Sequence, residues 1–269
     1  METTIANHLD TPSIGAIVGN FRNITTRKEL ERQKDEFVAV ATHELRTPVT
    51  SLKGYAQLLR NRFRKAGDEA SALLMERMDG QTDRLVALIG DLLDATKVEA
   101  GQLRLEPEAF AIDDLVGERA AEMQLTTEHH RIRQVGRADA AVVADRDRIG
   151  QVLTNLLSNA IKYPPPEGDI QVTADRDGDG VRVCVRDRGP GIPEDQRDRV
   201  FDRFYRLGDD ADRGHPGLGL GLYIAAEIVR RHDGRIWVEA APGEGARFCF
   251  WLPRAAAGAG TIAGTAASG

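Results

Sequence analysis

Two stretches of helical periodicity, joined by a short polar turn, restrict the fold of the first part of the chain more than any other feature. The first stretch follows Thr26–Glu29, which has the pattern of a helix capping box. A polar turn, RKAGDEAS at 64–71, separates it from the second stretch, which covers about 70–100 and ends at Gly101. Together they predict an antiparallel helical hairpin, with the following apolar residues at helical spacing: Leu30, Phe37, Val40, Ala41 and Leu45, then Leu74, Met78, Leu85, Leu88, Leu92 and Ala95.

A hairpin of this size has too little core to stand alone, so both apolar stripes need a partner. We favour pairing with a second copy of the hairpin in a four-helix bundle. The alternative is packing against the rest of the same chain. Pro48 interrupts the first helix and is expected to bend it.

The bulk properties describe a globular protein of one large or two ordinary domains. Of its 269 residues, 41% are hydrophobic and 29% are charged. The net charge of -6 argues against a general affinity for nucleic acid or anionic membranes. No signal peptide or run of about 20 apolar residues is present, so any membrane anchor is expected outside this chain. Cys184 and Cys249 form no CxxC pair, indicating neither a disulfide framework nor a zinc site, and a reducing cytoplasm is the expected location.

Beyond Gly101 the pattern changes to mixed strands and helices. Helices are expected from Asp113 to about 125, from Asp145 to 163 and over 220–231, with the two aspartates as caps. Strands are expected near 102–110 and over 130–135, as a hairpin over 169–187 that turns at DGDG, and as a final pair over 234–240 and 246–253. This order predicts an α+β sandwich, with one mixed sheet and helices on one face. One further strand is expected over 16–24, and a disordered tail over 255–269.

Three glycine-bearing segments fall in this second part: DRGPGIP (187–193), HPGLGLGL (215–222) and PGEGARF (242–248). In the middle one, Gly217, Gly219 and Gly221 open a predicted helix, whose free N–H groups favour a phosphate. The segment matches neither a Walker loop nor a dinucleotide-binding turn, because no GK[ST] and no parallel βαβ unit accompany it.

The segment NLLSNAIKY supplies groups for a cation and for phosphate. Asn155, Asn159 and Lys162 share one face of the predicted helix. Asparagine is a poor choice inside a helix, but its amide oxygen suits Mg²⁺, and lysine can neutralise a phosphate. A merely solvated face is the alternative.

In this combination the chain resembles a bacterial sensor histidine kinase of a two-component system. HELRTPVTSLKGY resembles the H box of that family, NLLSNAIKY its N box, DRGPGI its first G box, FDRFYR its F box and GLGLGL its second G box. They occur in the family's order and cover about 30–253. The resemblance implies a dimerisation and phosphotransfer hairpin over 26–101 and a catalytic ATP-binding domain over 102–254, of the gyrase and heat-shock chaperone type.

The resemblance also implies roles for individual residues. His43 would be phosphorylated, Glu44 would act as its general base, and Thr47 would position a water for hydrolysis of an aspartyl phosphate. Asn159 would hold Mg²⁺, Asp187 would bind the adenine amino group, and 202–216 would form a lid. Many relatives carry Thr or Ser where Leu218 stands. The residues implied to bind ATP are Asn155, Asn159, Lys162, Tyr163, Asp187, Gly189, Gly191, Ile192, Arg203, Phe204, Gly217, Leu218, Gly219, Leu220, Gly221 and Leu222.

The implied function is ATP-dependent autophosphorylation on His43, followed by transfer to an aspartate of a response regulator receiver domain. Phosphatase activity toward that regulator is a further expectation. The implied partners are a second copy, the regulator and an upstream sensor domain, because GAIVGNFRNIT resembles the last strand of a PAS domain and makes 1–25 a PAS-like remnant. Two alternatives are a scaffold that binds ATP without transferring phosphate, and an ATPase clamp. The intact His43, Glu44, Asn159 and Asp187 argue against the scaffold, and the H box argues against the clamp.

Overall fold

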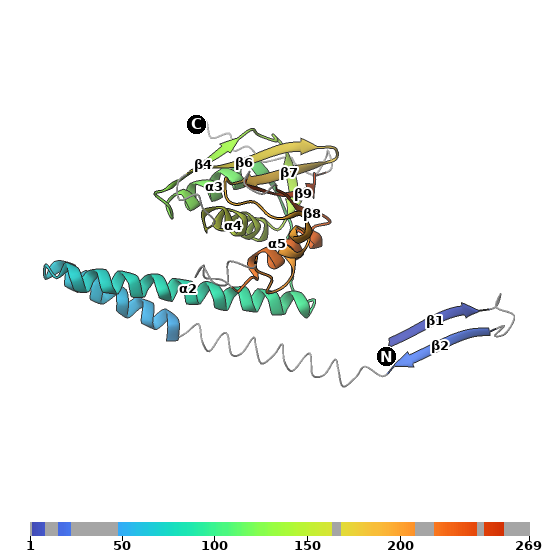
Figure 1. Ribbon diagram of the computed structural model, residues 1–269, viewed down its shortest axis with the longest axis horizontal. Coiled ribbons are helices and arrows are strands. Elements are labelled where there is room, and N and C mark those ends of the chain that lie inside the picture. Colours follow the sequence, from blue (N-terminus) through green and yellow to red (C-terminus); the bar gives the residue numbers. More distant parts are fainter. Residues whose placement is uncertain are drawn as a thin grey trace, which may run out of the picture. The chain divides into compact units, whose positions relative to one another are not determined.

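The computed structural model describes residues 2–8, 16–22, 48–162, 168–207, 218–240 and 245–255 (Figure 1). The chain divides into two compact units, Met1–Leu103 and Arg104–Gly269. Among the described helices, none is long and apolar enough to cross a membrane.

The first unit contains the predicted helical hairpin. One helix is described over 48–65, and a short turn leads to α2, Glu69–Glu99. The Asp68 carboxylate caps α2 by accepting a hydrogen bond from the Ser71 amide at 3.0 Å. Gly101 has a φ of 69°, the left-handed conformation with which helices commonly end. The hairpin is confirmed over these residues, whereas the chain before Pro48 and the predicted bend lie outside the described part.

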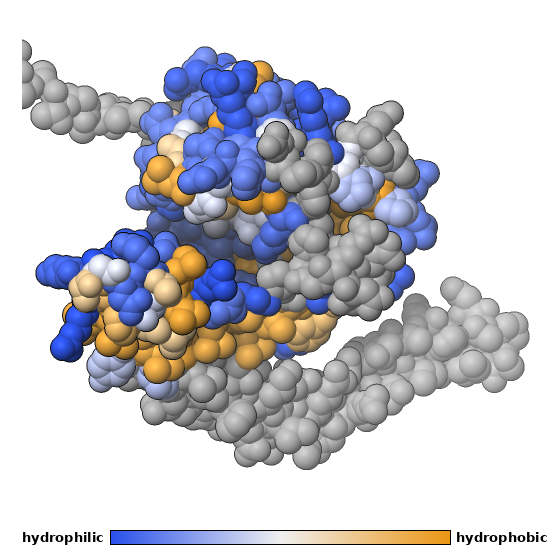
Figure 2. Space-filling view, turned by 60° about the vertical axis from the view of Figure 1, so that its left-hand side comes forward, coloured by the Kyte–Doolittle hydropathy of each residue, from blue (hydrophilic) through white to orange (hydrophobic). Residues whose placement is uncertain are grey.

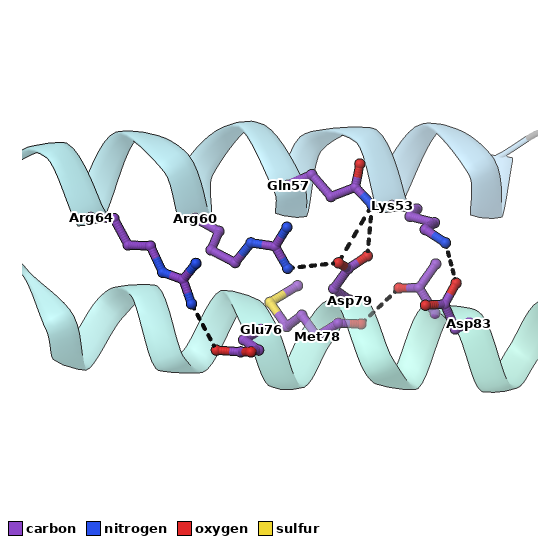
Figure 3. Close-up of polar contacts among 9 residues, drawn as sticks. Lys53, Gln57, Arg60, Arg64, Glu76, Met78, Asp79 and Asp83 are labelled. Atoms are coloured by element: carbon purple, nitrogen blue, oxygen red, sulfur yellow. Dashed lines mark hydrogen bonds and ion pairs between the residues drawn. The ribbon is translucent and has the colours of Figure 1, made fainter. Parts of the chain in front are cut away.

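Polar side chains join the two helices in a row (Figure 3). Arg60 Nη1 lies 3.0 Å from Asp79 Oδ2, and the Gln57 side-chain amide donates to the same carboxylate. Lys53 pairs with Asp83, and Arg64 with Glu76. Asp79 is buried, so its pairing restricts the register of the hairpin more than the exposed pairs do.

The hairpin also exposes large apolar side chains. Leu58 is 69% exposed and Leu74 is 57% exposed. Figure 2 shows a hydrophobic band along the helical pair. Much of the apolar surface predicted to need a partner is therefore unburied in the single chain. The exposed large apolar residues of the two helices are Leu52, Tyr55, Leu58, Leu59, Leu73, Leu74, Met78 and Leu85.

Two strands precede the hairpin in the sequence. β1, Glu2–His8, pairs antiparallel with β2, Ala16–Arg22. The prediction of a single strand over 16–24 was therefore incomplete. Ile5 is the one large aliphatic residue of β1, so this segment has no apolar alternation that would indicate a strand. The assignment of 1–25 to a PAS remnant stays a prediction.

The second unit is built on a five-stranded mixed sheet in the order β4-β6-β7-β9-β8. β4 (His130–Val135) runs parallel to β6 (Gly168–Asp177), and the remaining pairs are antiparallel. They involve β7 (Gly180–Arg186), β8 (Arg235–Ala240) and β9 (Ala246–Pro253). The predicted α+β sandwich is confirmed.

Three helices cover one face of this sheet: α3 (Ile112–Gln124), α4 (Arg146–Lys162) and α5 (Gly221–Arg231) (Figure 1). Inward side chains alternate along the strands, as Val183 and Val185 do on β7 opposite Phe250 and Phe248 on β9. They are buried together with the following apolar residues of α4 and α5: Leu153, Leu156, Leu157, Ile224 and Ile228. This core holds the start of α5 beside the middle of α4.

A small second sheet was missed by the sequence analysis. β3 (Glu108–Ala111) pairs antiparallel with β5 (Ala141–Ala144), a four-residue strand too short for a periodicity signal. Between them, Asp113 does not cap α3 as predicted. It lies inside the first turn, and its carboxylate accepts hydrogen bonds from the amides of Ala138 (3.0 Å) and Asp139 (2.8 Å). Tertiary hydrogen bonding has therefore replaced local capping at this position.

The two cysteines also differ from expectation. Cys184 on β7 and Cys249 on β9 are directly opposite each other and form a disulfide. The prediction of no disulfide was wrong, because a separation of 65 residues in sequence does not reveal that these two strands pair.

Candidate functional site

One wall of the candidate site is the polar face of α4. The Asp145 carboxylate caps this helix at the Arg148 amide (3.0 Å), as predicted. Asn155 and Asn159 are half-buried, one turn apart, and Lys162 ends the helix with an exposed side chain. The predicted common face of these residues is therefore confirmed.

The second wall is the start of α5. Leu220 occupies the cap position and offers no side-chain hydrogen bond to the first-turn amides of α5. The Asn155 side-chain amide donates to the Gly221 carbonyl oxygen at 3.0 Å, which fixes this helix start to α4. Uncapped amides at a helix N-terminus attract phosphate, and Asn159 lies one turn further along α4.

A backbone hydrogen bond joins the beginning of the predicted lid to the segment that follows it. The Phe204 amide donates to the Gly219 carbonyl oxygen at 3.1 Å, and both residues have left-handed φ angles, 61° and 69°. A Cβ at Gly219 would lie 2.7 Å from the Tyr205 carbonyl oxygen, so only glycine allows this approach. Phe204 and Leu218 remain exposed, and the guanidinium of Arg203 lies 4.6 Å from the Phe204 ring centroid. Residues 208–217, most of the predicted lid, lie outside the described part.

The third element is Asp187, directly after β7. It is 7% exposed, and its Oδ1 accepts hydrogen bonds from the amides of Gly189 (2.8 Å) and Ala246 (3.1 Å). Its own amide donates to the Ala246 carbonyl oxygen at 2.9 Å. Burial raises the pKa of the Asp187 carboxyl above its ordinary value, while the two amide bonds oppose that rise. An acceptor held rigidly in a buried position suits recognition of an amino group.

The loops around Asp187 need glycine for their close approach. Gly191 has a φ of 75°, and Ile192 is buried beside it. Gly245 has a φ of 87°, and a Cβ there would lie 2.1 Å from the Asp187 carbonyl oxygen. Sequence reasoning noted the PGEGARF segment but did not connect Gly245 and Ala246 with Asp187, because the link depends on the pairing of β7 with β9.

The structure thus brings several predicted site residues together. Asn155 contacts Gly221, Phe204 contacts Gly219, and Asp187 contacts Gly189. The remaining described candidates lie on the same elements: Asn159, Lys162, Gly191, Ile192, Arg203, Leu218, Leu220 and Leu222. Five other candidates lie outside the described residues, so their roles stay predictions: His43, Glu44, Thr47, Tyr163 and Gly217.

Comparison with known proteins agrees with this geometry. The model of the His Kinase A (phospho-acceptor) domain matches residues 33–101. The model of the histidine kinase-, DNA gyrase B- and HSP90-like ATPase matches residues 144–256. Both domains therefore occur in one chain, in that order. The chain belongs to the sensor histidine kinase family.

Individual histidine kinases align over most of the chain. The alginate biosynthesis sensor protein KinB of Pseudomonas aeruginosa is 37% identical over 244 residues, which are 90% of this chain and 40% of KinB. The sensor histidine kinase WalK of Bacillus subtilis is 34% identical and is covered to the same 40%. The chain thus spans about 40% of the length of these curated relatives.

A solved structure shows the same fold. Full-length ShkA in complex with AMPPNP has a TM-score of 0.67 and 29% identity, covering 82% of this chain and 46% of ShkA. The second unit accordingly contains a domain of the histidine kinase-, DNA gyrase B- and HSP90-like ATPase family. The described donor set also suits Mg²⁺, because that ion takes one or two protein oxygens and completes its shell with water and phosphate oxygens, and Asn159 offers one such oxygen.

Proposed function

We propose that this protein uses ATP to phosphorylate its own His43 and passes the phosphoryl group to an aspartate of a response regulator. The observation that carries the proposal is the junction of α4 and α5. There the Asn155–Gly221 hydrogen bond holds a helix start, which the Leu220 side chain does not cap, beside the polar face of α4, in a chain whose residues 33–101 match a phosphoacceptor domain.

Each side of the site has one part in binding ATP. Asp187 would accept a hydrogen bond from the adenine amino group, and the amides at the start of α5 would receive the phosphates. Asn159 would hold Mg²⁺, which offsets negative charge on the phosphates when bound. Lys162 ends α4 and would neutralise a phosphate.

The transfer itself would use the histidine and its neighbour in sequence. A neutral imidazole is a nucleophile near neutral pH. Its attacking nitrogen forms a bond to the γ-phosphorus as the bond from that phosphorus to the β–γ bridging oxygen breaks, and ADP leaves. Glu44 takes the proton from the other ring nitrogen. Thr47, four residues after His43, would position a water when the regulator is dephosphorylated.

The proposal includes the setting of the site. The domain boundaries remain those of the sequence analysis, 26–101 for the hairpin and 102–254 for the catalytic domain. A homodimer, an upstream sensor domain and a receiver-domain partner complete the proposed assembly. A cytoplasmic location follows from the use of ATP as the phosphoryl donor.

Incubation with γ-labelled ATP followed by acid or base treatment tests this function. We expect acid-labile, base-stable label on the wild type and none on His43→Gln. ATP hydrolysis without label on the chain would favour an ATPase clamp. ATP binding with neither label nor hydrolysis would favour a scaffold. Either result would overturn the kinase proposal.

A further inference from the structure

The cysteine pair lies on the face of the sheet that the helices leave uncovered. Val183 and Val185 point to the core, so Cys184 between them points to the other face. One row crosses the sheet there: Thr173, Cys184, Cys249 and Trp237 are directly opposite one another in turn. The cysteines are thus not part of the helix-covered core.

Both sulfur-bearing residues are nevertheless shielded, at 1% and 0% exposure. Arginine side chains two positions along the strands share this face and are themselves partly exposed. Arg182 and Arg247 are each 34% exposed, and Arg235 is 66% exposed. A small reagent therefore needs movement of surface side chains, not opening of the core, to reach the sulfurs.

The same pair of strands leads directly to the nucleotide pocket. Asp187 follows Cys184 by three residues, and Ala246 precedes Cys249 by three. At that level the strands are joined by the Asp187 amide to the Ala246 carbonyl oxygen, and by the Ala246 amide to Asp187 Oδ1. The disulfide is thus a covalent cross-link between β7 and β9, and the hydrogen-bonded ladder of these two strands ends at Asp187, the carboxylate proposed to bind adenine.

We propose that Cys184 and Cys249 form a redox-modification site that takes a low-molecular-weight disulfide as oxidant and adjusts ATP affinity through the Asp187–Ala246 hydrogen bonds. The nucleotide part of this proposal rests on the proposed function. In the oxidised chain the covalent cross-link holds β7 against β9 beside Asp187. Reduction releases the two sulfurs, which must then separate to non-bonded distance and loosen the strand pairing toward Asp187 and Ala246, three residues along.

The chemistry balances in two exchanges. A thiolate of the pair attacks the small disulfide RSSR, forming a mixed disulfide and releasing one RSH. The second cysteine then attacks the protein sulfur of that mixed disulfide and releases the other RSH. Two electrons pass from the cysteine pair to RSSR, and the two thiol protons appear on the two RSH molecules.

The test uses the full chain in a series of glutathione buffers from reduced to oxidised. Free thiols are counted by alkylation and mass spectrometry, and binding of a non-hydrolysable ATP analogue is measured in the same samples. We expect the dissociation constant of the analogue to be about 3- to 10-fold higher in the reduced chain, the effect of about one hydrogen bond. Cys184→Ala/Cys249→Ala is the matched control and should show one affinity in all buffers.

Two results would overturn the proposal. One is a chain whose two cysteines stay reduced in oxidised buffer, and the other is complete disulfide formation with unchanged affinity. Amide hydrogen exchange over 185–188 and 245–249 gives a readout that needs no nucleotide. If the analogue binds in neither state, the proposed function fails, and exchange that is faster in the reduced chain still supports the redox coupling. Equal exchange in both states would overturn that coupling.

Discussion

At the scale of single residues, Asp187 shows that a candidate binding residue can lower the stability of the folded state. A buried carboxylate loses hydration, and burial accordingly raises its pKa. Because the folded-state pKa lies above the unfolded value, the folded state retains the proton more strongly. Its contribution to stability is therefore present below the unfolded pKa and is lost as pH rises through the folded pKa. At neutral pH the ionised group destabilises the fold that it serves.

The substitution Asp187→Asn separates the loss of stability caused by the buried charge from the proposed role of the side chain in binding ATP. The amide oxygen can still accept the hydrogen bonds of Gly189 and Ala246, while the buried charge is removed. We expect a higher melting temperature than wild type at pH 7.5, and a difference that shrinks as pH falls toward the ordinary carboxyl pKa of about 3.9. We also expect the affinity for an ATP analogue to fall at least about tenfold. A melting temperature below wild type at pH 7.5 would contradict the assigned cost.

Gly245 tests the close approach behind Asp187. Gly245→Ala places a Cβ 2.1 Å from the Asp187 carbonyl oxygen and strains a residue with a φ of 87°. Gly178→Ala is the matched control, with a φ of 62° in the turn between β6 and β7 and no atom within 4 Å of the added Cβ. We expect losses in unfolding free energy of about 2–4 and about 1 kcal/mol respectively, measured by urea unfolding. Equal losses would show that Gly245 is needed only for its backbone conformation.

The sequence predicted the local parts of this site but not its long-range contacts. Asn155 and Asn159 were found from helical spacing, and Gly219 and Gly221 from their place before a helix. The Ala246 amide on Asp187 and the Cys184–Cys249 bond both depend on the pairing of β7 with β9. No periodicity within either strand indicates that pairing, so these contacts had no signal in the sequence.

At the scale of elements, Asp79 shows what sets the register of the hairpin. Its side chain is 12% exposed and pairs with Arg60, whereas the Glu76 side chain of the next pair is 52% exposed. Truncation of Asp79 leaves the positive charge of Arg60 without a partner carboxylate at the partly buried contact between the two helices. Truncation of the exposed partner leaves Arg64 in water.

We therefore expect Asp79→Ala to lower the unfolding free energy of the hairpin by about 1–3 kcal/mol. Glu76→Ala, the matched control on the same helix, should cost less than about 0.5 kcal/mol. Both changes introduce alanine into α2, so helix propensity affects them alike. Helical circular dichroism during urea unfolding, at one fixed protein concentration, measures the difference. Equal losses would remove Asp79 from the register-setting role.

The elements found from the sequence are those with strong local signals. The helices α2, α4 and α5 and the hairpin turning at Gly178 follow from periodicity, caps and turn residues. β1 and β5 were missed because a short strand without alternation has no such signal. Asp113 was misassigned because its tertiary partners, the amides of Ala138 and Asp139, compete with capping.

At the scale of the whole molecule, the exposed apolar band of the hairpin indicates the oligomeric state of the protein. Leu58 and Leu74 expose more than half of their surface in the single chain. A second hairpin would cover such a band in a four-helix bundle. We therefore expect a dimer by light scattering at micromolar concentration, and a monomer there would refute the bundle. In that dimer each catalytic domain has two copies of His43 to choose between.

The length of the linker does not decide which of the two histidines is phosphorylated, but subunit exchange can test it. Residues 100–107 join α2 to β3 and span at most about 28 Å when fully extended. Which histidine a catalytic domain reaches depends on the handedness of the turn near 65–69, and we predict transfer to the partner's histidine. Mixing His43→Gln, which keeps a working ATP site, with Asn159→Asp, which keeps the histidine, should label the Asn159→Asp chain from γ-labelled ATP. Each variant alone should stay unlabelled. An unlabelled mixture, with exchange of subunits verified by mass, would show that transfer occurs within one chain.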